Sequence, residues 1–244
     1  MHIEPERLRE LTDEVDQLHH ESMRTVQDNL ADVHFGERGG DLRRARRRFL
    51  KRSVVGGAVL TVGSTVLPVS RLVPAAWAQA TPSDKDIVAF AQSVELAAVK
   101  AYGAAASSGK LSQGALDVVR TFAGHHQDHA DAFGALLGTP DAPAAGKANQ
   151  KVLATFTPKI QAATDEAAVL EVAYTVEEAA AATYYFALGA LSDQKTASGA
   201  ATILPVESQH AVVLATILKK PASDYLAAFQ TGTNALNPDD YPVR

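Results

Sequence analysis

Apolar residues recur every three to four positions from residue 83 onward, which is the spacing of one face of an α-helix. This part of the chain has no alternation of apolar and polar residues of the kind that predicts strands, and no two-residue hairpin turn. Capping residues, glycines and prolines divide it into four long helices, expected at about 83–107, 112–137, 164–191 and 196–220. Shorter helices are expected at 151–163, interrupted at Pro158, and at 224–230. The pattern therefore predicts an all-α domain.

The connection between the second and third long helices is expected to be long, because residues 139–150 are rich in Pro, Gly and Ala. The other two connections are short, so the first helix should pair with the second and the third with the fourth. Thr196 or Ser198 is the expected start of the fourth helix, and Pro205 inside it predicts a kink. The expected fold is a four-helix bundle made of two helical hairpins joined by a long crossover.

Residues 1–42 form a charged leader with a weak apolar stripe, and they are expected to be helical or disordered. His19 and His20 in this leader are candidate metal ligands. Neighbouring residues on a helix do not share a face, so a solvated helix or a disordered leader is the favoured interpretation of the pair.

The segment at 43–78 has the composition of a secretory signal. Seven positive charges fall within residues 43–52, an apolar run follows at 54–69, and Ala76 and Ala78 form a small-residue cleavage pattern. The apolar run is shorter and richer in glycine than the ~20 apolar residues of a spanning helix. Cleavage is therefore favoured over an uncleaved membrane anchor, and the mature domain, a bundle with a short C-terminal tail, is expected at 79–244.

Within the basic run, Arg46-Arg47-Arg48-Phe49-Leu50-Lys51 closely resembles the twin-arginine export motif. The resemblance implies export of an already folded protein by the twin-arginine export machinery, to the periplasm, the cell envelope or the outside. Proteins loaded with a cofactor commonly use this route, which is consistent with a metal site.

Charge and cysteine content narrow the candidate chemistry. Residues 1–78 hold 12 Lys and Arg against 11 Asp and Glu, whereas residues 79–244 hold 11 against 17. The second part is mildly acidic and has no basic patch, so nucleic acid is not an expected partner. The chain has no cysteine, which excludes disulfides, thiolate metal sites and cysteine catalysis. Any metal ion must therefore be bound by histidine and carboxylate.

One spacing of candidate ligands occurs twice. Val-Glu is followed by Tyr seven residues after the Glu, at Glu95 and Tyr102 and again at Glu177 and Tyr184. Downstream of each Glu lies a pair of ligand residues three apart, His126 with His129 and Glu207 with His210. Residues three apart share a helix face, so each pair can point at one interior position. The duplication predicts a metal site between four helices.

Each candidate also has a plainer interpretation. A single Glu on a helix is usually a solvent-facing residue, and the two copies at matching spacing are what favour interior ligands. Tyr102 and Tyr184 are expected mainly to pack in the core, the alternatives being hydrogen bonds to the ligand carboxylates or a redox role. His125 and Asp128 are expected at the surface or as groups that orient a ligand imidazole.

These residues and the helix order resemble a ferritin-like domain of the exported bacterial type over residues 83–220. The resemblance implies a di-metal site with one Glu on the first helix, Glu-x-x-His on the second, one Glu on the third and Glu-x-x-His on the fourth. The positions that match are Glu95, His129, Glu177, Glu207 and His210, with Glu177 preferred to Glu178 because it repeats the first-half spacing. His126 stands where the family has Glu, which leaves three carboxylates and three histidines.

The resemblance implies an exported metal-binding protein, with iron as one or two ions and Mn or Zn as alternatives. The activity it implies is oxidation of Fe(II) or reaction with oxygen or peroxide. The loss of one carboxylate at His126 favours a single ion or Zn. The same change at His126 supports an alternative function, that of a non-catalytic cell-envelope or stress protein that kept the bundle and lost the metal. A third possibility is a membrane-tethered interaction module that uses the leader as a contact. The oligomeric state is left open.

Overall fold

The structure is a computed structural model. It describes residues 82–138, 146–225 and 234–243, the N-terminal residues 6, 9–10, 12–17 and 19–20, and the backbone of two short strands. The predicted twin-arginine motif and the Ala76-x-Ala78 pattern lie outside the described residues.

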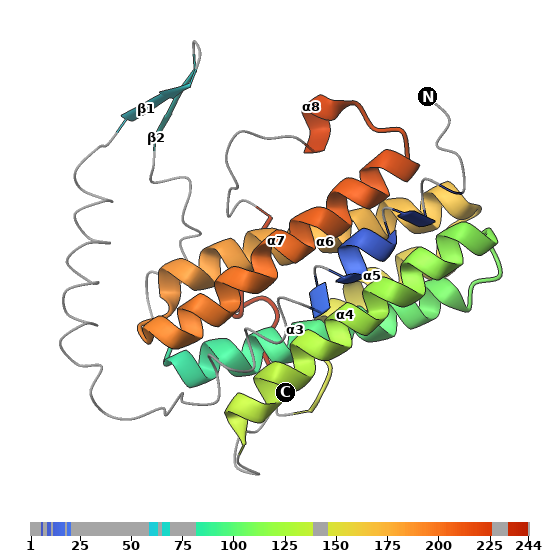
Figure 1. The fold of residues 1–244 in the computed structure, drawn as a ribbon. Helices are drawn as coiled ribbons and strands as arrows, with labels where there is room; N and C mark the ends of the chain where they lie inside the picture. The colour runs from blue at the N-terminus through green and yellow to red at the C-terminus, as the bar shows by residue number, and fades with distance from the viewer. Residues whose placement is uncertain are drawn as a thin grey trace.

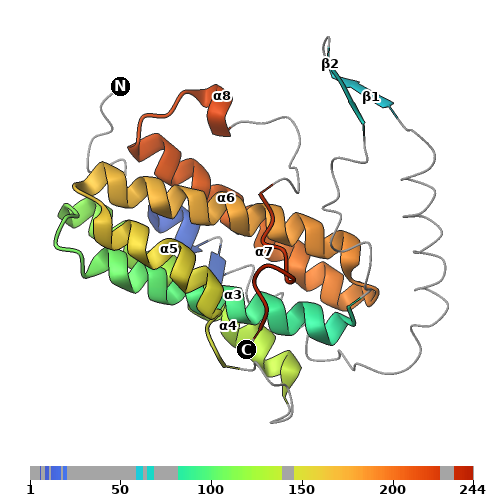
Figure 2. The same cartoon turned by 180° about the vertical axis from the view of Figure 1, so that it is seen from behind.

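Four long helices form a bundle, as predicted (Figure 1). They are α3 (Asp84–Ala106), α4 (Gln113–Leu137), α6 (Glu166–Ala190) and α7 (Gln194–Ile217). α3 packs chiefly against α4 and α6 against α7, which gives the two hairpins. The shorter α5 (Gln150–Ala162) lies against α3 and α6, on the side seen in Figure 2. The all-α prediction is confirmed, and the bundle interior is formed by facing stripes of small and aliphatic side chains from these helices.

The helix starts follow from capping side chains. Ser83 and Asp86 form a capping box at α3, and Ser112 and Asp165 cap α4 and α6. The predicted start of α7 at Thr196 or Ser198 is wrong, because the Asp193 carboxylate accepts a hydrogen bond from the Thr196 amide at 2.8 Å and starts the helix earlier. The helix boundaries are therefore set by local polar side chains.

Two prolines lie inside helices without interrupting them. The predicted interruption at Pro158 is wrong, because α5 is continuous from Gln150 to Ala162. Proline removes only one backbone donor, and the stripe of Val152, Phe156 and Ile160 is buried on the bundle and holds the helix. α7 likewise continues as one helix through Pro205.

Outside the bundle, the structure has a short helix α8 (Ala222–Tyr225), at the start of the segment where a last helix is expected. Strands β1 (Val59–Val62) and β2 (Thr65–Pro68) pair antiparallel, with Val59 opposite Pro68. These strands fall within the apolar run of the predicted signal segment.

The described part of the leader is helical and packs on the bundle. Thr12, Val15 and His19 are buried, whereas neighbours such as Asp13, Glu14 and His20 are exposed. The interpretation of His19 as part of a solvated or disordered leader is therefore wrong. Its side chain is 0 % exposed, on the one helix face that contacts the bundle.

Among the described helices, α7 alone is long and apolar enough to cross a membrane. Half of its most apolar stretch is buried in the bundle, and the helix contributes Glu207 and His210 to the interior. Its apolar character is accounted for by its place in the core.

Candidate metal centre

The six predicted ligand residues meet in the middle of the bundle. α3 contributes Glu95, α4 His126 and His129, α6 Glu177, and α7 Glu207 and His210. Glu95 is 2 % exposed and the other five side chains are 0 % exposed. Glu178, the rejected alternative to Glu177, is only partly buried. Six ionisable side chains shielded from water in this way need either one another or a bound ion.

The side chains form two overlapping groups of four. In one, single ligand atoms of Glu95, His126, His129 and Glu207 all lie within 4.8 Å of one another. In the other, the same holds for His126, Glu177, Glu207 and His210. His126 and Glu207 belong to both groups, so the six side chains could hold one shared ion or two neighbouring ones.

His126 lies between the two helices that carry the single glutamates. Its Nδ1 is 2.7 Å from Glu95 Oε2 and its Nε2 is 3.0 Å from Glu177 Oε1. Both ring nitrogens thus face carboxylates, at the position where the sequence departs from the Glu pattern. This histidine joins the two halves of the centre.

Glu207 and His129 are the part of the centre that lacks hydrogen bonds. His129 Nδ1 is 3.0 Å from Glu207 Oε1, but the orientation is not that of a hydrogen bond. Both Glu207 oxygens and both His129 ring nitrogens are buried and have no hydrogen-bond partner among the described residues. Such buried polar atoms are costly, and a cation between them would satisfy the carboxylate and one nitrogen. The donor set therefore fits a metal ion.

Tyr102 and Tyr184 connect the two halves reciprocally. The Tyr102 hydroxyl on α3 donates to Glu177 Oε1 on α6, and the Tyr184 hydroxyl on α6 donates to Glu95 Oε1 on α3. Burial first, and then the partner carboxylate, raises the pKa of each tyrosine, which keeps both hydroxyls protonated as donors. The favoured interpretation as core packing alone is incomplete, since both rings are buried and also orient the ligand carboxylates.

His125 contacts a ligand imidazole, which is the second of its two predicted roles, and it does not lie at the surface. It is 1 % exposed, and its Nδ1 is 2.8 Å from Nε2 of His210. Burial first, and then the nearby imidazoles of His210 and His19, lowers the pKa of His125, so the ring is neutral. The Phe122 ring stacks on His210 with centroids 3.9 Å apart, so His210 is held from two sides.

Glutamates and histidines compensate one another's burial. For Glu95, burial raises the pKa, but the hydrogen bond from His126 and the positive charges of His126 and His129 outweigh it and lower the pKa to about 2. For His129, burial lowers the pKa, but Glu207 and Glu95 raise it to about 9. The pKa of Glu177 is lowered against burial by His126 and His210, whose own pKa values are raised. Without metal, charged carboxylates thus face protonated imidazoles.

These pKa values predict a bell-shaped pH dependence of the stability of the metal-free protein. The contribution of Glu95 is complete above pH 4.5 and is lost as the pH falls through about 2. The contribution of His129 is complete below pH 6.5 and is lost as the pH rises through about 9. Urea unfolding followed by circular dichroism should therefore give the highest free energy of unfolding between these limits. A His129→Gln variant should lose much of the alkaline decline, and an unchanged decline would contradict this assignment.

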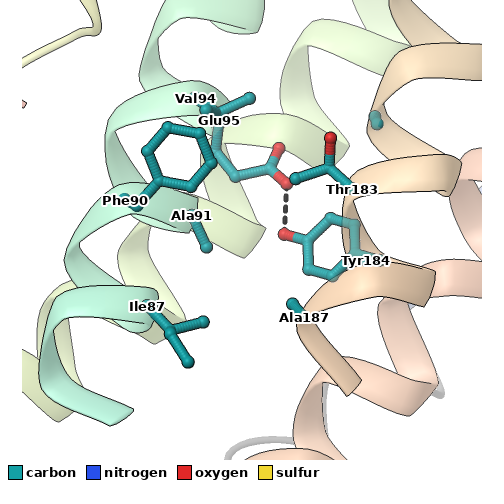
Figure 3. A pocket seen from close by; sticks show the side chains of 9 residues that line it. Ile87, Phe90, Ala91, Val94, Glu95, Thr183, Tyr184 and Ala187 are labelled. Carbon is teal, nitrogen blue, oxygen red and sulfur yellow. Dashed lines mark hydrogen bonds between the residues drawn. The ribbon is translucent and has the colours of Figure 1, made fainter. Parts of the chain in front are cut away.

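A small apolar pocket reaches the centre beside Glu95. It is lined mainly by side chains of α3 and α6, among them Ile87, Phe90 and Ala187. Figure 3 shows the Glu95 carboxylate and the Tyr184 hydroxyl facing each other across it. The pocket is suited to a small uncharged molecule, because Glu95 is its one charged lining residue and most of the others are apolar.

Comparison with known proteins agrees with this geometry. The ferritin-like domain family matches residues 83–220. The match covers the four long helices and all six side chains of the centre, and the chain belongs to this family. No curated protein and no solved structure matches the chain.

Proposed function

We propose that this chain is an exported ferritin-like protein that binds iron in the bundle interior. The observation that carries the proposal is the set of six buried histidine and glutamate side chains, in which Glu207 and His129 lack hydrogen-bond partners in the described part of the chain. Carboxylates favour hard ions and imidazole suits Fe and Zn, so the mixed set suits iron, with Mn or Zn as alternatives.

The residues have distinct roles in this proposal. Glu95, Glu177 and Glu207 would supply negative charge, and His129 and His210 would bind through Nδ1, the nitrogen that faces the carboxylates. Three carboxylates leave an excess positive charge on two divalent ions. One tightly held ion is therefore proposed for the native chain.

The proposed activity is oxidation of Fe(II), with iron as substrate. Bound iron would supply one-electron redox chemistry, so two Fe(II), taken one after the other, and two protons would be consumed for each peroxide reduced to two waters. The apolar pocket beside Glu95 would admit such a small oxidant, and Tyr184 at its wall would hold the carboxylate in place.

Anaerobic titration with Fe(II) tests the binding site. The native chain should retain one Fe(II), and Glu207→Gln should bind it at least about tenfold more weakly because a carboxylate ligand is lost. Ser208→Ala, a change at the adjacent helix position, should bind as the native chain does. Peroxide added to the loaded native protein should produce the absorption of Fe(III). A native chain that retains no Fe(II) would contradict the proposal.

Export by the twin-arginine route is the second part of the proposal, and it rests on Arg46 and Arg47 with Ala76 and Ala78. Replacing both arginines with lysine should leave the precursor in the cytoplasm. Trp77 is the single tryptophan of the chain, so cleavage after Ala78 should remove all tryptophan fluorescence. Unchanged export of the double variant would rule out this route. N-terminal sequencing that finds the leader on the exported protein would favour the membrane-tethered module.

One observation favours the non-catalytic alternative. His126 hydrogen-bonds both Glu95 and Glu177, so much of the metal-free centre is already paired. A protein with this core can fold without an ion. Metal content of the exported protein separates the two functions.

A further inference from the structure

The described leader residues, 12–17 and 19–20, which we call the cover segment, lie against the metal centre. Thr12, Val15 and His19 are its buried residues, and their spacing of three and four places them on one helix face. Val15 packs into the same apolar cluster as the core residues of the long helices. The segment is thus docked on the bundle along its length.

His19 of the cover segment contacts the histidines of α4. Its ring stacks on His125, with centroids 3.9 Å apart and planes 15° apart, and its centroid is 4.9 Å from that of the ligand His129. His19 Nε2 is 3.2 Å from Asp128 Oδ2, while its buried Nδ1 has no hydrogen-bond partner among the described residues. His19 therefore covers the side of the centre formed by His125 and His129.

Asp16 of the cover segment starts a hydrogen-bond chain that ends at a ligand. Its Oδ1 is 2.9 Å from Nε2 of His125, whose Nδ1 is 2.8 Å from Nε2 of His210. A carboxylate accepts, so His125 donates from Nε2 to Asp16, and its Nδ1 is left as the acceptor for the Nε2–H of His210. Without metal, His210 also donates from Nδ1 to Glu177 Oε2, which is 3.0 Å away. With an ion bound, the Nε2–H that His125 accepts would leave Nδ1 as the His210 nitrogen that holds the metal.

We propose that the cover segment closes the metal centre in the full-length precursor, with Asp16 acting as a positioning residue for His210 through His125. The inference rests on the proposed function, because the cover segment precedes the predicted signal and all six ligands follow it. Cleavage after Ala78 would separate Asp16 and His19 covalently from the centre. The precursor then holds its ion under cover, and the processed protein presents an open centre.

The first test of the cover uses the metal-free full-length chain. Exchange of the imidazole C2 hydrogen of His125 for deuterium, measured by mass spectrometry, should be slow in the native chain and several-fold faster in Val15→Glu. Glu14→Gln, on the exposed face of the same segment, should exchange as the native chain does. His19→Ala, which removes the stacked ring without adding charge, should also speed exchange. Equal rates in native, Val15→Glu and His19→Ala chains would overturn the cover.

The second test loads the same full-length chains with Co(II). Release of cobalt to a chelator should be several-fold faster from Val15→Glu than from the native chain or Glu14→Gln. Asp16→Asn should change the ligand-field absorption of the bound cobalt, and Asp16→Glu should restore it in part; an unchanged spectrum in Asp16→Asn would overturn the positioning role. A native chain that binds no cobalt would contradict both the proposed metal function and the positioning role of Asp16. The histidine exchange experiment would still show whether the cover segment covers the bundle.

Discussion

Replacing His126 with glutamate is expected to raise the number of tightly bound Fe(II) ions from one per chain to two. The native centre has three carboxylates, and the fourth introduced at this position would offset the repulsion between two divalent cations. The position lies in both groups of candidate ligands, so a carboxylate there can reach either ion. The measurement is metal stoichiometry after loading under identical anaerobic conditions.

A matched variant separates charge from shape at the same position. His126→Gln removes the imidazole without adding charge, and it should bind one Fe(II) more weakly than the native chain. The His126→Glu protein should also be less stable than the native protein without metal, because a fourth buried carboxylate replaces the histidine that hydrogen-bonds Glu95 and Glu177. Two irons per native chain, unaffected by either change, would show that His126 is a bystander.

The second large effect is expected at Glu177 in the metal-free protein. Glu177→Gln should lower the free energy of unfolding by about 3–5 kcal/mol at about pH 6, the usual cost of breaking a buried ion pair. The carboxylate accepts from His126, His210 and Tyr102. Its loss leaves the protonated imidazole of His210 without its hydrogen-bonded carboxylate and leaves His126 with Glu95 alone. Urea unfolding at equilibrium measures the change.

The neighbouring glutamate provides the control for this prediction. Glu178 lies one position along α6 and is only partly buried, so Glu178→Gln should change the free energy of unfolding by no more than about 0.5 kcal/mol. The difference between the two substitutions tests the prediction that Glu177, and not Glu178, is the interior residue. That prediction rested on the repeated spacing alone. Equal changes in the free energy of unfolding for the two substitutions would contradict the claim that the ion pairs of Glu177 stabilise the metal-free bundle.

The bundle and the six central side chains were predictable because both follow from helix periodicity. A spacing of three places Glu207 and His210 on one face, and the duplicated interval from Glu to His places the two halves opposite each other. The predicted start of α7 was too late because Thr196 and Ser198 are also good N-cap residues. Asp193 caps the helix in the structure, and that choice depends on where the turn after α6 ends. Boundaries are set by such local competition.

The contacts of the leader could not be predicted from periodicity. Asp16 and His19 meet residues of α4 that are 109 positions away in the chain, and no local pattern encodes such a pairing. The rule that neighbours do not share a helix face holds for His19 and His20, since one is buried and the other exposed. That rule excludes a shared role for the pair, but it does not exclude burial of one member.

The most direct test of the central claim is elemental analysis of the protein purified from the exported fraction of its native host. The proposal predicts about one iron per chain, with less Mn and Zn, because the three carboxylates and three histidines of the centre suit one such ion. The Glu207→Gln protein prepared in the same way should lack it. An exported native protein that contains no stoichiometric metal would contradict the proposal and favour the non-catalytic bundle.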